Sequence, residues 1–430
     1  MSSVHSTGAE PEKRAGYAGI ARFGWLVLLV VLVSAAALVV RDGAWPAVRL
    51  LAQGLAMLCG TAALLGCIYT LLAGVLVRRF FAREPVEPAN CPSVTVVRPL
   101  HGDEWSLQRN LESFFQQDYA GPVQFLFGVH DSSDPALRVV ETIRQLYPDA
   151  HIDVVADARL YGPNRKISNI LNMLPQARHD VFVFADSDVS VGPSWLRHAV
   201  GALEQPDVGL VTCAYRGEPA PGCWSLLSSV SVNYQFIPGV VAGVSLKLAH
   251  PCLGPTIAMR RSTLDRIGGF EPFVHHLAED YEIGRAVRNA GEKIVIPPFV
   301  ISHACVERDA ACLVGHKLRW GRTIRAIDPL GHLGSALMHP VALSVLAVLL
   351  SGAAAWSWPA VPLAVLAQLA LKRQADRALS TRRSAWWLPA LWDIASFGVF
   401  VASFCSRRVS WRGFSFNVDS EGRLSPIEDR

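Results

Sequence analysis

Long stretches without charged residues are the feature that most constrains how this chain can fold. Residues 23–40 and residues 50–77 contain no Asp, Glu, Lys or Arg. Both stretches reach the roughly 18 to 20 residues that a helix needs to cross a bilayer. The first is longer than the apolar core of a typical signal peptide, and the second follows it directly. The sequence therefore predicts two retained transmembrane helices within residues 23–77, preceded by an N-terminal cytosolic tail of residues 1–22.

A second apolar block lies near the C-terminus. Residues 329–371 carry no charge and are long enough for two spans, although prolines interrupt them. Residues 386–406 form a second apolar run, which contains Asp393 and has arginines on both sides. If the last run crossed the membrane, the basic tail of residues 407–430 would lie outside, which the positive-inside rule disfavours. We therefore expect transmembrane and interfacial helices over residues 329–406, with about four spans in the whole chain and one re-entrant or interfacial segment.

The polar segment between these blocks, residues 91–325, has the size of an ordinary domain. Basic residues precede the first apolar run and follow the second, so the positive-inside rule places both of these flanking segments on the cytoplasmic side. These residues are Lys13, Arg14, Arg22, Arg78, Arg79 and Arg83. We expect the polar domain to face the cytosol.

Charge and cysteine content exclude several classes of protein. The net charge is only +4, and the basic residues flank apolar runs, which favours anionic lipid headgroups over nucleic acid as a partner. The nine cysteines form no CxxC pair, so neither a disulfide framework nor a zinc site is indicated.

Short β-branched runs alternate with amphipathic helical patterns in the polar segment. The helical patterns include residues 135–147 and 194–204. The strand-like runs are residues 93–97, 123–129, 152–155, 181–185 and 209–213. This alternation predicts an α/β domain with a doubly wound sheet, in which ligands bind beyond the carboxyl ends of the strands.

Two carboxylates one residue apart, Asp186 and Asp188, follow the apolar run of residues 181–185. The chain has no GxxxxGK[ST] loop and no GxGxxG fingerprint, which disfavours a kinase, an ATPase or a dinucleotide enzyme. The carboxylates of Asp186 and Asp188 can bind a hard divalent cation that bridges two phosphate oxygens of a nucleotide diphosphate. Alone, a D-x-D is more often a strand-end turn that caps neighbouring amides.

Two further loops accompany this pair. Asp131 ends the second strand-like run, where a carboxylate can accept a hydrogen bond from a base N–H such as the uracil imide; an Asp-Pro turn suits Asp134 better. Arg165 and Lys166 stand in a Gly/Pro loop and could meet phosphate or uracil oxygens. The alternative for the basic pair is a solvated loop.

Two more segments bear on catalysis. Glu279 and Asp280 precede a helical pattern, and a carboxylate there could take the proton from an attacking hydroxyl, although acids at a helix start also complement the helix dipole. His316, Arg319 and Trp320 stand in a basic segment that could stabilise a leaving diphosphate or serve only as a juxtamembrane anchor.

In this order, Asp131, Asp186-Ser-Asp188, Glu279-Asp280 and His316-Lys-Leu-Arg319-Trp320 resemble the D, D, D, (Q/R)xxRW pattern of membrane glycosyltransferase families 2 and 21. The chain looks most similar to family 21, which includes glucosylceramide synthase. "VVRPLHGDE", "FFQQDY", "GGF" and "VSWRG" extend the resemblance. Within the family, "YGPNRKISNILNMLP" and "RRVSWRG" look most like the bacterial subgroup associated with hopanoid biosynthesis.

The resemblance implies a GT-A-type nucleotide-sugar-binding domain inserted between N- and C-terminal transmembrane helices. It makes Asp131, Asp186, Lys166 and His316 UDP-sugar-binding residues, with His316 standing where the pattern has Gln or Arg. It makes Asp280 the catalytic base, together with Arg319 and Trp320, and it makes Asp188 and His303 ligands of Mg²⁺ or Mn²⁺.

The implied activity is an inverting transfer of N-acetylglucosamine from UDP-N-acetylglucosamine to bacteriohopanetetrol at the bacterial cytoplasmic membrane. Ceramide glucosylation from UDP-glucose and processive polysaccharide synthesis are alternatives with the same pattern. An inactive membrane scaffold or lipid-binding protein with this fold is an alternative of another class.

Overall fold

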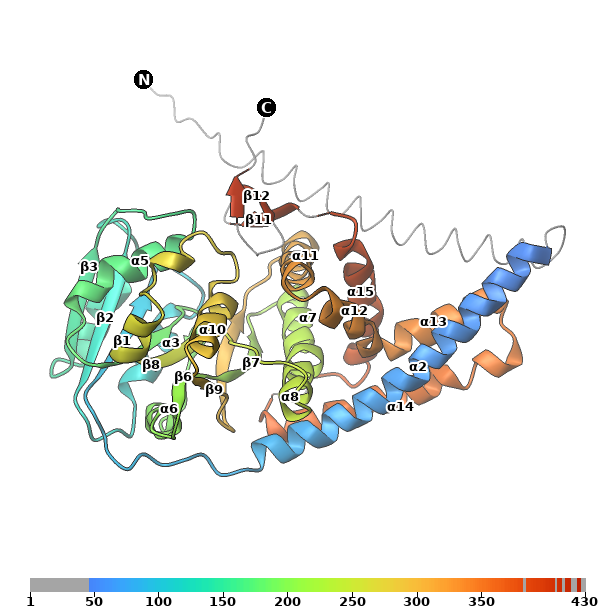
Figure 1. Cartoon of the computed structure of the whole chain (residues 1–430), viewed down its shortest axis with the longest axis horizontal. Coiled ribbons are helices and arrows are strands. Elements are labelled where there is room, and N and C mark those ends of the chain that lie inside the picture. The colour runs from blue at the N-terminus through green and yellow to red at the C-terminus, as the bar shows by residue number, and fades with distance from the viewer. Residues whose placement is uncertain (1–45, 382–383, 407, 412–413, 419–423, 427–430) are drawn as a thin grey trace, which may run out of the picture. The chain divides into compact units, whose positions relative to one another are not determined.

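The structure is a computed structural model, and it describes residues 46–381, 384–406, 408–411, 414–418 and 424–426 (Figure 1). The predicted tail of residues 1–22 and the predicted span over residues 23–40 lie outside the described residues. The chain divides into two compact units. Unit 1 consists of Met1–Val77, Pro221–Gly239 and Glu307–Arg430, and unit 2 consists of Arg78–Ala220 and Val240–Val306.

Unit 2 is built on a seven-stranded mixed sheet. In spatial order its strands are β3 (His151–Ala156), β2 (Val123–Val129), β1 (Val94–Pro99), β4 (Val181–Ala185), β8 (Thr256–Arg260), β6 (Val208–Thr212) and β9 (Lys293–Val295). Only β8 runs antiparallel to its neighbours in this sheet. The five predicted strand-like runs coincide, within two residues at each end, with β1, β2, β3, β4 and β6.

Helices cover both faces of this sheet because successive side chains of a strand point to opposite faces. Leu126 of β2 joins a buried cluster with Ile167 of helix α5 (Arg165–Met173). Its neighbours Phe125 and Phe127 stack on Phe115 of helix α3 (Leu107–Phe115), with ring centroids 4.0 and 6.5 Å apart. The predicted α/β class with a doubly wound sheet is therefore confirmed.

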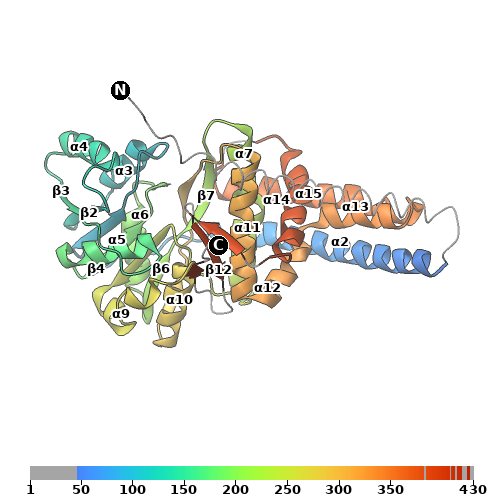
Figure 2. The same ribbon diagram turned by 90° about the horizontal axis from the view of Figure 1, so that it is seen from above.

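The remaining helices of unit 2 fill the connections between strands. Figure 2 shows α3 and α4 on one side of the sheet and α9 and α10 on the other. Their bounds, with those of the other short helices, are α4 (Ala136–Leu146), η1 (Leu174–Gln176), α6 (Trp195–Leu203), α9 (Arg261–Arg266), η3 (Glu271–Phe273) and α10 (Glu279–Asn289).

A second, three-stranded sheet extends unit 2 beyond β4. It has the order β5 (Val189–Ser190), β10 (Val300–Cys305) and β7 (Ala214–Pro219). Strand β10 pairs antiparallel with β5, so that His303 lies opposite Val189. This pairing brings a residue from late in the sequence beside the chain that leaves β4.

Unit 1 is mainly helical. Its described elements are α2 (Pro46–Phe81), α7 (Cys223–Ser231), the π-helical turn η2 (Val232–Phe236), α8 (Ile237–Ser245), α11 (Ala310–Ile327), α12 (Pro329–Gly334), η4 (Ser335–Met338), α13 (Pro340–Leu350), η5 (Ala355–Ser357), α14 (Ala360–Ala378), α15 (Leu388–Ser403), β11 (Arg408–Trp411), β12 (Phe414–Val418) and β13 (Leu424–Pro426). Residues 78–81 of α2 and residues 240–245, most of α8, belong to unit 2.

Small residues let α2 pack closely on its neighbours in unit 1. A Cβ added at Gly66 would lie 2.6 Å from the carbonyl oxygen of Leu337, so a larger residue would force the backbones apart. The outer side of α2 is different, because Leu50, Leu58 and Ile68 are 74%, 65% and 63% exposed. An apolar surface of this kind is typical of a helix that contacts lipid or another protein.

Among the described residues, one helix, Val48–Phe81, is long and apolar enough to cross a membrane. A second candidate is the bent pair Pro329–Met338 and Pro340–Leu350, whose two helices meet at 74°. The apolar helix Leu388–Ser403 is shorter. The predicted number of four spans stays a prediction.

Candidate active site

Two of the predicted donor-binding residues of unit 2, Lys166 and Asp186, lie together at the carboxyl end of β4. Because β8 runs antiparallel to β4, its first residue, Thr256, pairs with Ala185, the last residue of β4. The backbone N–H of Asp186 donates to the carbonyl of Pro255 at 3.1 Å. The loop before β8 therefore lies beside the D-x-D pair, although it is 70 residues further along the chain.

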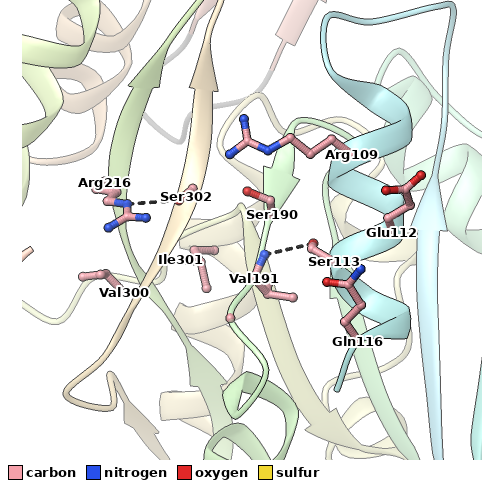
Figure 3. A pocket seen from close by; sticks show the side chains of 11 residues that line it. Arg109, Glu112, Ser113, Gln116, Ser190, Val191, Arg216, Val300, Ile301 and Ser302 are labelled. Atoms are coloured by element: carbon pink, nitrogen blue, oxygen red, sulfur yellow. Dashed lines mark hydrogen bonds between the residues drawn. The ribbon is translucent and has the colours of Figure 1, made fainter. Parts of the chain in front are cut away.

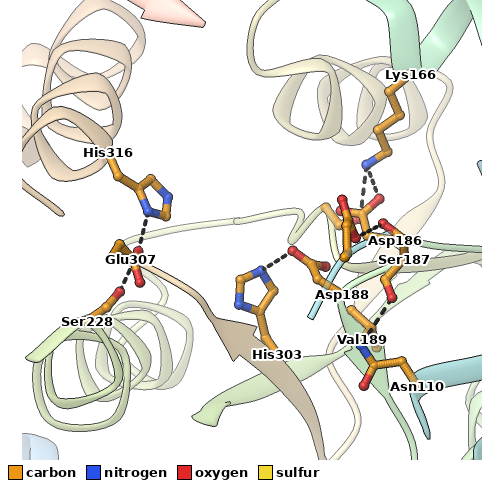
Figure 4. Close-up of polar contacts among 12 residues, drawn as sticks. Asn110, Lys166, Asp186, Ser187, Asp188, Val189, Ser228, His303, Glu307 and His316 are labelled. Carbon is orange, nitrogen blue, oxygen red and sulfur yellow. Dashed lines mark hydrogen bonds and ion pairs between the residues drawn. The ribbon is translucent and has the colours of Figure 1, made fainter. Parts of the chain in front are cut away.

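Lys166 lies at the centre of this group (Figure 4). Its Nζ is 2.6 Å from Asp186 Oδ1 and 3.2 Å from Glu279 Oε1. The three side chains are 22%, 28% and 13% exposed, so they interact in a medium of lower effective dielectric than water. Burial opposes the charged form of Lys166, but the two carboxylates outweigh it and raise the pKa of the lysine.

Asn164 sets the position of Lys166. It is fully buried and caps α5, with its side-chain oxygen accepting from the N–H of Ile167 at 3.1 Å. Its Nδ2 donates to Glu279 Oε2 at 3.2 Å and to the carbonyl of His276 at 3.0 Å. One side chain thus joins the start of α5, which carries Lys166, to the start of α10, which carries Glu279 and Asp280.

Asp280, the predicted base, is half-buried in the first turn of α10. Its Oδ1 accepts from the N–H of Tyr281 at 2.8 Å. Burial, followed by the negative charge of Glu279, raises the pKa of Asp280 to about 7, although the charge of Lys166 opposes the shift. A carboxyl group with a pKa near neutrality is suited to accept a proton and release it again.

Asp188 and His303 form the part of the site that fits a metal ion. His303 Nε2 lies 3.3 Å from Asp188 Oδ2, and the other Asp188 oxygen is buried without a hydrogen-bond partner among the described residues. Burial raises the pKa of Asp188, but its interactions with His303 outweigh this and lower it. The same interaction outweighs burial and raises the pKa of His303, so the imidazole would lose its Nε2 proton when Mn²⁺ binds. Within the described residues, no group of three or more His, Cys, Asp or Glu residues forms a complete cluster for a metal ion.

A buried arginine holds the backbone of the D-x-D segment. Arg98, in β1, is 0% exposed, and its Nη2 donates to the carbonyls of Asp186 at 2.6 Å and Val189 at 3.3 Å. Its guanidinium lies over the ring of Phe114, 3.9 Å from the centroid. The two carboxylates therefore stand on a rigid turn rather than on a free loop.

Asp131 lies after β2, apart from the Lys166 group. It is exposed, and its Oδ1 accepts from both the N–H and the hydroxyl of Ser133, which lowers the pKa of Asp131. Asp134 accepts from the N–H groups of Ala136 and Gly102, each at 2.9 Å, and is thus the turn residue that the sequence indicated. The exposed Asp131 carboxylate keeps lone pairs for a ligand, but its role stays a prediction.

His316, Arg319 and Trp320 lie on α11, in unit 1. His316 packs edge-on against Trp320, with ring centroids 4.9 Å apart and planes at 85°. Trp320 in turn contacts Phe236 of the π-helical turn at 5.1 Å. Their predicted part in the same reaction as the unit 2 carboxylates stays a prediction.

A separate polar cavity of about 320 Å³ lies in unit 2 (Figure 3). Its lining includes Arg109 of α3 and Arg216 of β7. Arg109 forms an ion pair with Glu218 at 2.8 Å, and Arg216 Nε donates to Ser302 Oγ at 3.1 Å. None of the predicted site residues lines this cavity.

The structure adds three residues that the sequence did not single out: Asn164, Arg98 and Glu307. The first two support the segments that carry Lys166, Glu279 and Asp186, and Glu307 contacts His316. A capping Asn before a helix is a readable signal for Asn164. Arg98 acts through Asp186 and Val189, which lie far away in the sequence, and no local pattern predicts the contact of Glu307 with His316.

The family model Glycosyl transferase family 21 matches residues 58–424 of the chain. Among curated proteins, ceramide glucosyltransferase 1 of Caenorhabditis elegans is 28% identical over 264 residues, covering 59% of this chain and 54% of that protein. Ceramide glucosyltransferase 3 of the same organism is 23% identical over 365 residues, covering 79% and 76%. The chain thus spans about half the length of the first of these relatives.

Among solved structures, a mannosyltransferase from Pyrobaculum calidifontis in complex with GDP-Man and Mn²⁺ matches with a TM-score of 0.49 and 20% identity. The match covers 82% of this chain and 99% of that chain.

Proposed function

The chain belongs to glycosyl transferase family 21, and on that premise we propose that it transfers a sugar from a UDP-sugar to a hydroxyl group of a membrane lipid. It is a transferase whose unit 2 has a GT-A-type α/β fold with a mixed sheet. The observation that carries the proposal is the group of Lys166, Asp186, Glu279 and Asp280 at the end of β4, where a cation and a carboxyl of raised pKa lie together.

Asp280 has the properties of the base in this reaction. The lipid hydroxyl attacks the anomeric carbon, the new C–O bond forms as the bond to the UDP oxygen breaks, and the hydroxyl proton passes to Asp280. Attack from the side opposite to UDP inverts the configuration at that carbon. The pKa of about 7 lets Asp280 lose that proton to solvent at neutral pH before the next turnover.

Lys166 is the residue of unit 2 suited to the diphosphate. Asp186 and Glu279 hold its ammonium in the site, where it would donate to a phosphate oxygen in place of one of these carboxylates. Asp188 and His303 would hold a divalent metal ion, which would supply positive charge for the leaving UDP oxygens.

The membrane acceptor explains why an apolar helix accompanies this unit. A lipid with a large ring system or long chains leaves the bilayer only at a high cost, at roughly 25 cal/mol for each Å² of apolar surface exposed. The helix Val48–Phe81, with its exposed leucines, would keep the enzyme at the bilayer surface. By the distribution of basic residues, we propose a multi-pass protein of the bacterial cytoplasmic membrane whose unit 2 faces the cytosol.

For the substrates, we propose N-acetylglucosamine as the sugar and bacteriohopanetetrol as the acceptor, because of the similarity of the α5 and C-terminal segments to the hopanoid-associated subgroup. A second pair, glucose and ceramide, is favoured by the curated relatives, which are ceramide glucosyltransferases.

The experiment that tests the proposal compares membranes containing the wild-type chain, Asp280→Asn and Asp149→Asn. Asp149 is an exposed carboxylate of unit 2 and serves as the matched control. With Mn²⁺, a UDP-sugar and a lipid acceptor, we expect glycolipid from the wild type and Asp149→Asn but not from Asp280→Asn. Glycolipid formation by Asp280→Asn at the wild-type rate would refute the role of Asp280.

A further inference from the structure

The polar cavity of unit 2 lies between helix α3 and the three-stranded sheet (Figure 3). Its volume of about 320 Å³ is at the lower end of the range of roughly 300 to 1,000 Å³ that is usual for small-molecule sites. On the helix wall, Arg109, Glu112, Ser113 and Gln116 are spaced so that they share one face. The facing wall consists of residues 190–192, 216 and 300–302. All of these residues belong to unit 2.

A row of polar side chains crosses the sheet wall of the cavity. Ser190 of β5 is paired with Ser302 of β10, and Ser302 is paired with Arg216 of β7. Paired residues of neighbouring strands point to the same face of a sheet, so the three side chains lie together on the cavity face. His303, the next residue of β10, points to the opposite face, where it contacts Asp188. The sheet therefore separates the cavity from the candidate metal site.

Hydrogen bonds hold the helix wall against the strand wall. The hydroxyl of Ser113 donates to the carbonyl of Asn110 at 2.7 Å and accepts from the N–H of Val191 at 3.1 Å. The side-chain amide of Gln117 donates to the carbonyl of Gly192 at 3.0 Å. The two walls are thus fixed relative to one another, as in small-molecule sites, which are largely pre-formed.

The described lining carries a net charge of +1, from two arginines, one on each wall, and one acid, Glu112. Figure 3 shows the arginine side chains of α3 and β7 on opposite sides of the cavity. Arg109 contacts Glu218 through Nη2 at 2.8 Å, and its side chain is 57% exposed. An exposed ion pair of this kind contributes little to stability, and a guanidinium has five N–H donors. Arg109 can therefore also donate to an anion in the cavity.

Two serine hydroxyls add donors on the sheet wall. Ser302 is 8% exposed, and its hydroxyl oxygen accepts from Arg216 Nε at 3.1 Å. A hydroxyl has one O–H donor besides its acceptor lone pairs, so the proton of Ser302 is available for a ligand. The hydroxyl of Ser190 also lines the cavity, and within the described residues it has no hydrogen-bond partner.

We propose that this cavity binds the phosphate group of a small ligand, with the two arginines of the lining and the hydroxyls of Ser190 and Ser302 as donors. Guanidinium groups pair with phosphate through charge-assisted hydrogen bonds. Donors on two walls match a tetrahedral anion with several oxygens better than a planar carboxylate. Glu112 and Gln116 offer acceptors for hydroxyl groups beside the phosphate. The site is separate from the group around Lys166, so it does not depend on the proposed sugar transfer.

The first test measures the binding of sn-glycerol 3-phosphate, a soluble phosphomonoester, to the full chain in dodecyl maltoside by calorimetry. Saturating UDP is present to occupy the donor site. We expect Arg109→Met to raise the Kd by about tenfold or more and Ser190→Ala to raise it by about threefold, the ranges for hydrogen bonds to charged and neutral groups. Arg144→Met is the matched control and should keep the wild-type Kd, because Arg144 is also a half-exposed arginine of unit 2 that pairs with a glutamate, at 2.9 Å.

The second test asks whether the phosphate belongs to a lipid headgroup. The Tm of each variant is measured in micelles with phosphatidylglycerol and in micelles with diacylglycerol, which lacks the phosphate. A rise in Tm with phosphatidylglycerol that is lost in Arg109→Met and kept in Arg144→Met assigns the site to a phospholipid. Binding of sn-glycerol 3-phosphate without this rise assigns it to a soluble ester. Equal results for the wild type and Arg109→Met with both probes would overturn the proposal.

Discussion

Replacing Lys166 with methionine should destabilise unit 2, and the loss should depend on pH. The ammonium lies 2.6 Å from one carboxylate and 3.2 Å from another. At an effective dielectric constant of about 20, each contact corresponds to roughly 5 to 6 kcal/mol of attraction before desolvation is subtracted. Removing one partner of a buried pair costs about 3 to 5 kcal/mol, and the partial exposure of these groups favours the lower value, about 3 kcal/mol.

The sign of the pH dependence follows from the carboxylates that remain. Burial already raises the pKa of Asp186 in the wild type, with Lys166 as the main opposing charge. Without Lys166 this pKa rises further above its unfolded value, so stability is lost as pH rises through the range where Asp186 ionises. The deficit of Lys166→Met should therefore be small near pH 5 and full near pH 8.

The assay is thermal unfolding of the detergent-solubilised protein at both pH values. At about 2 to 4 °C per kcal/mol for a unit of this size, the expected decrease in Tm at pH 8 is about 6 to 12 °C. Lys166→Arg keeps the charge and is the matched control. An equal loss at pH 5 and pH 8, or no loss at either, would refute the reasoning from the ion pairs.

Three other predictions concern catalysis, the metal and the fold. The kcat/KM of the wild type should rise with pH around an apparent pKa of about 7, because Asp280 must be ionised to accept a proton. Asp280→Asn should lower the rate by about 10²- to 10⁴-fold and retain UDP binding. A wild-type profile that is flat from pH 6 to 8 would contradict this role. Asp188→Asn should lower the affinity for Mn²⁺ in the presence of UDP by about tenfold or more, as measured by calorimetry, because a ligand is lost. His303→Asn should have a smaller effect. Unchanged Mn²⁺ affinity in both variants would exclude these residues as ligands. Arg98→Met should lower the unfolding free energy by about 3 kcal/mol, because it leaves buried carbonyls without a donor, and an unchanged Tm would show that these bonds contribute little.

Local patterns were sufficient for the strands and for the ends of β2 and β4. The β-branched runs predicted β1 to β4 and β6, and the polar residues that follow them, Asp131 and the D-x-D pair, lie at strand ends as expected. The reason is that strand propensity and the polarity of a strand end are properties of a few adjacent residues.

Contacts between distant segments could not be predicted in the same way. Lys166 was expected to meet phosphate or uracil oxygens, but its pairing with Glu279 depends on how α5 and α10 pack, more than 100 residues apart. The antiparallel strand β8 was missed for the same reason. His303 was placed beside Asp188 only by the family resemblance, and the structure shows that the pairing of β10 with β5 brings the two together.

The described residues contain only some of the predicted membrane helices. Helix α2 matches the predicted run of residues 50–77, whereas the span over residues 23–40 lies outside the described residues. Polar residues shorten the C-terminal candidates: α14 ends in a segment containing Lys372, Arg373, Asp376 and Arg377. Apolar composition alone does not separate a span from a helix buried against other helices.

The most direct test of the central claim is mass spectrometry of the lipid products formed by membranes that contain the protein. The incubations combine Mn²⁺ with UDP-N-acetylglucosamine or UDP-glucose, and with bacteriohopanetetrol or ceramide. We expect a mass gain of one N-acetylhexosamine on the hopanoid that is absent with Asp280→Asn. A hexose on ceramide would retain the mechanism and replace the substrates. No sugar on any lipid, from wild-type protein that still binds UDP, would contradict the claim that this chain is a lipid glycosyltransferase.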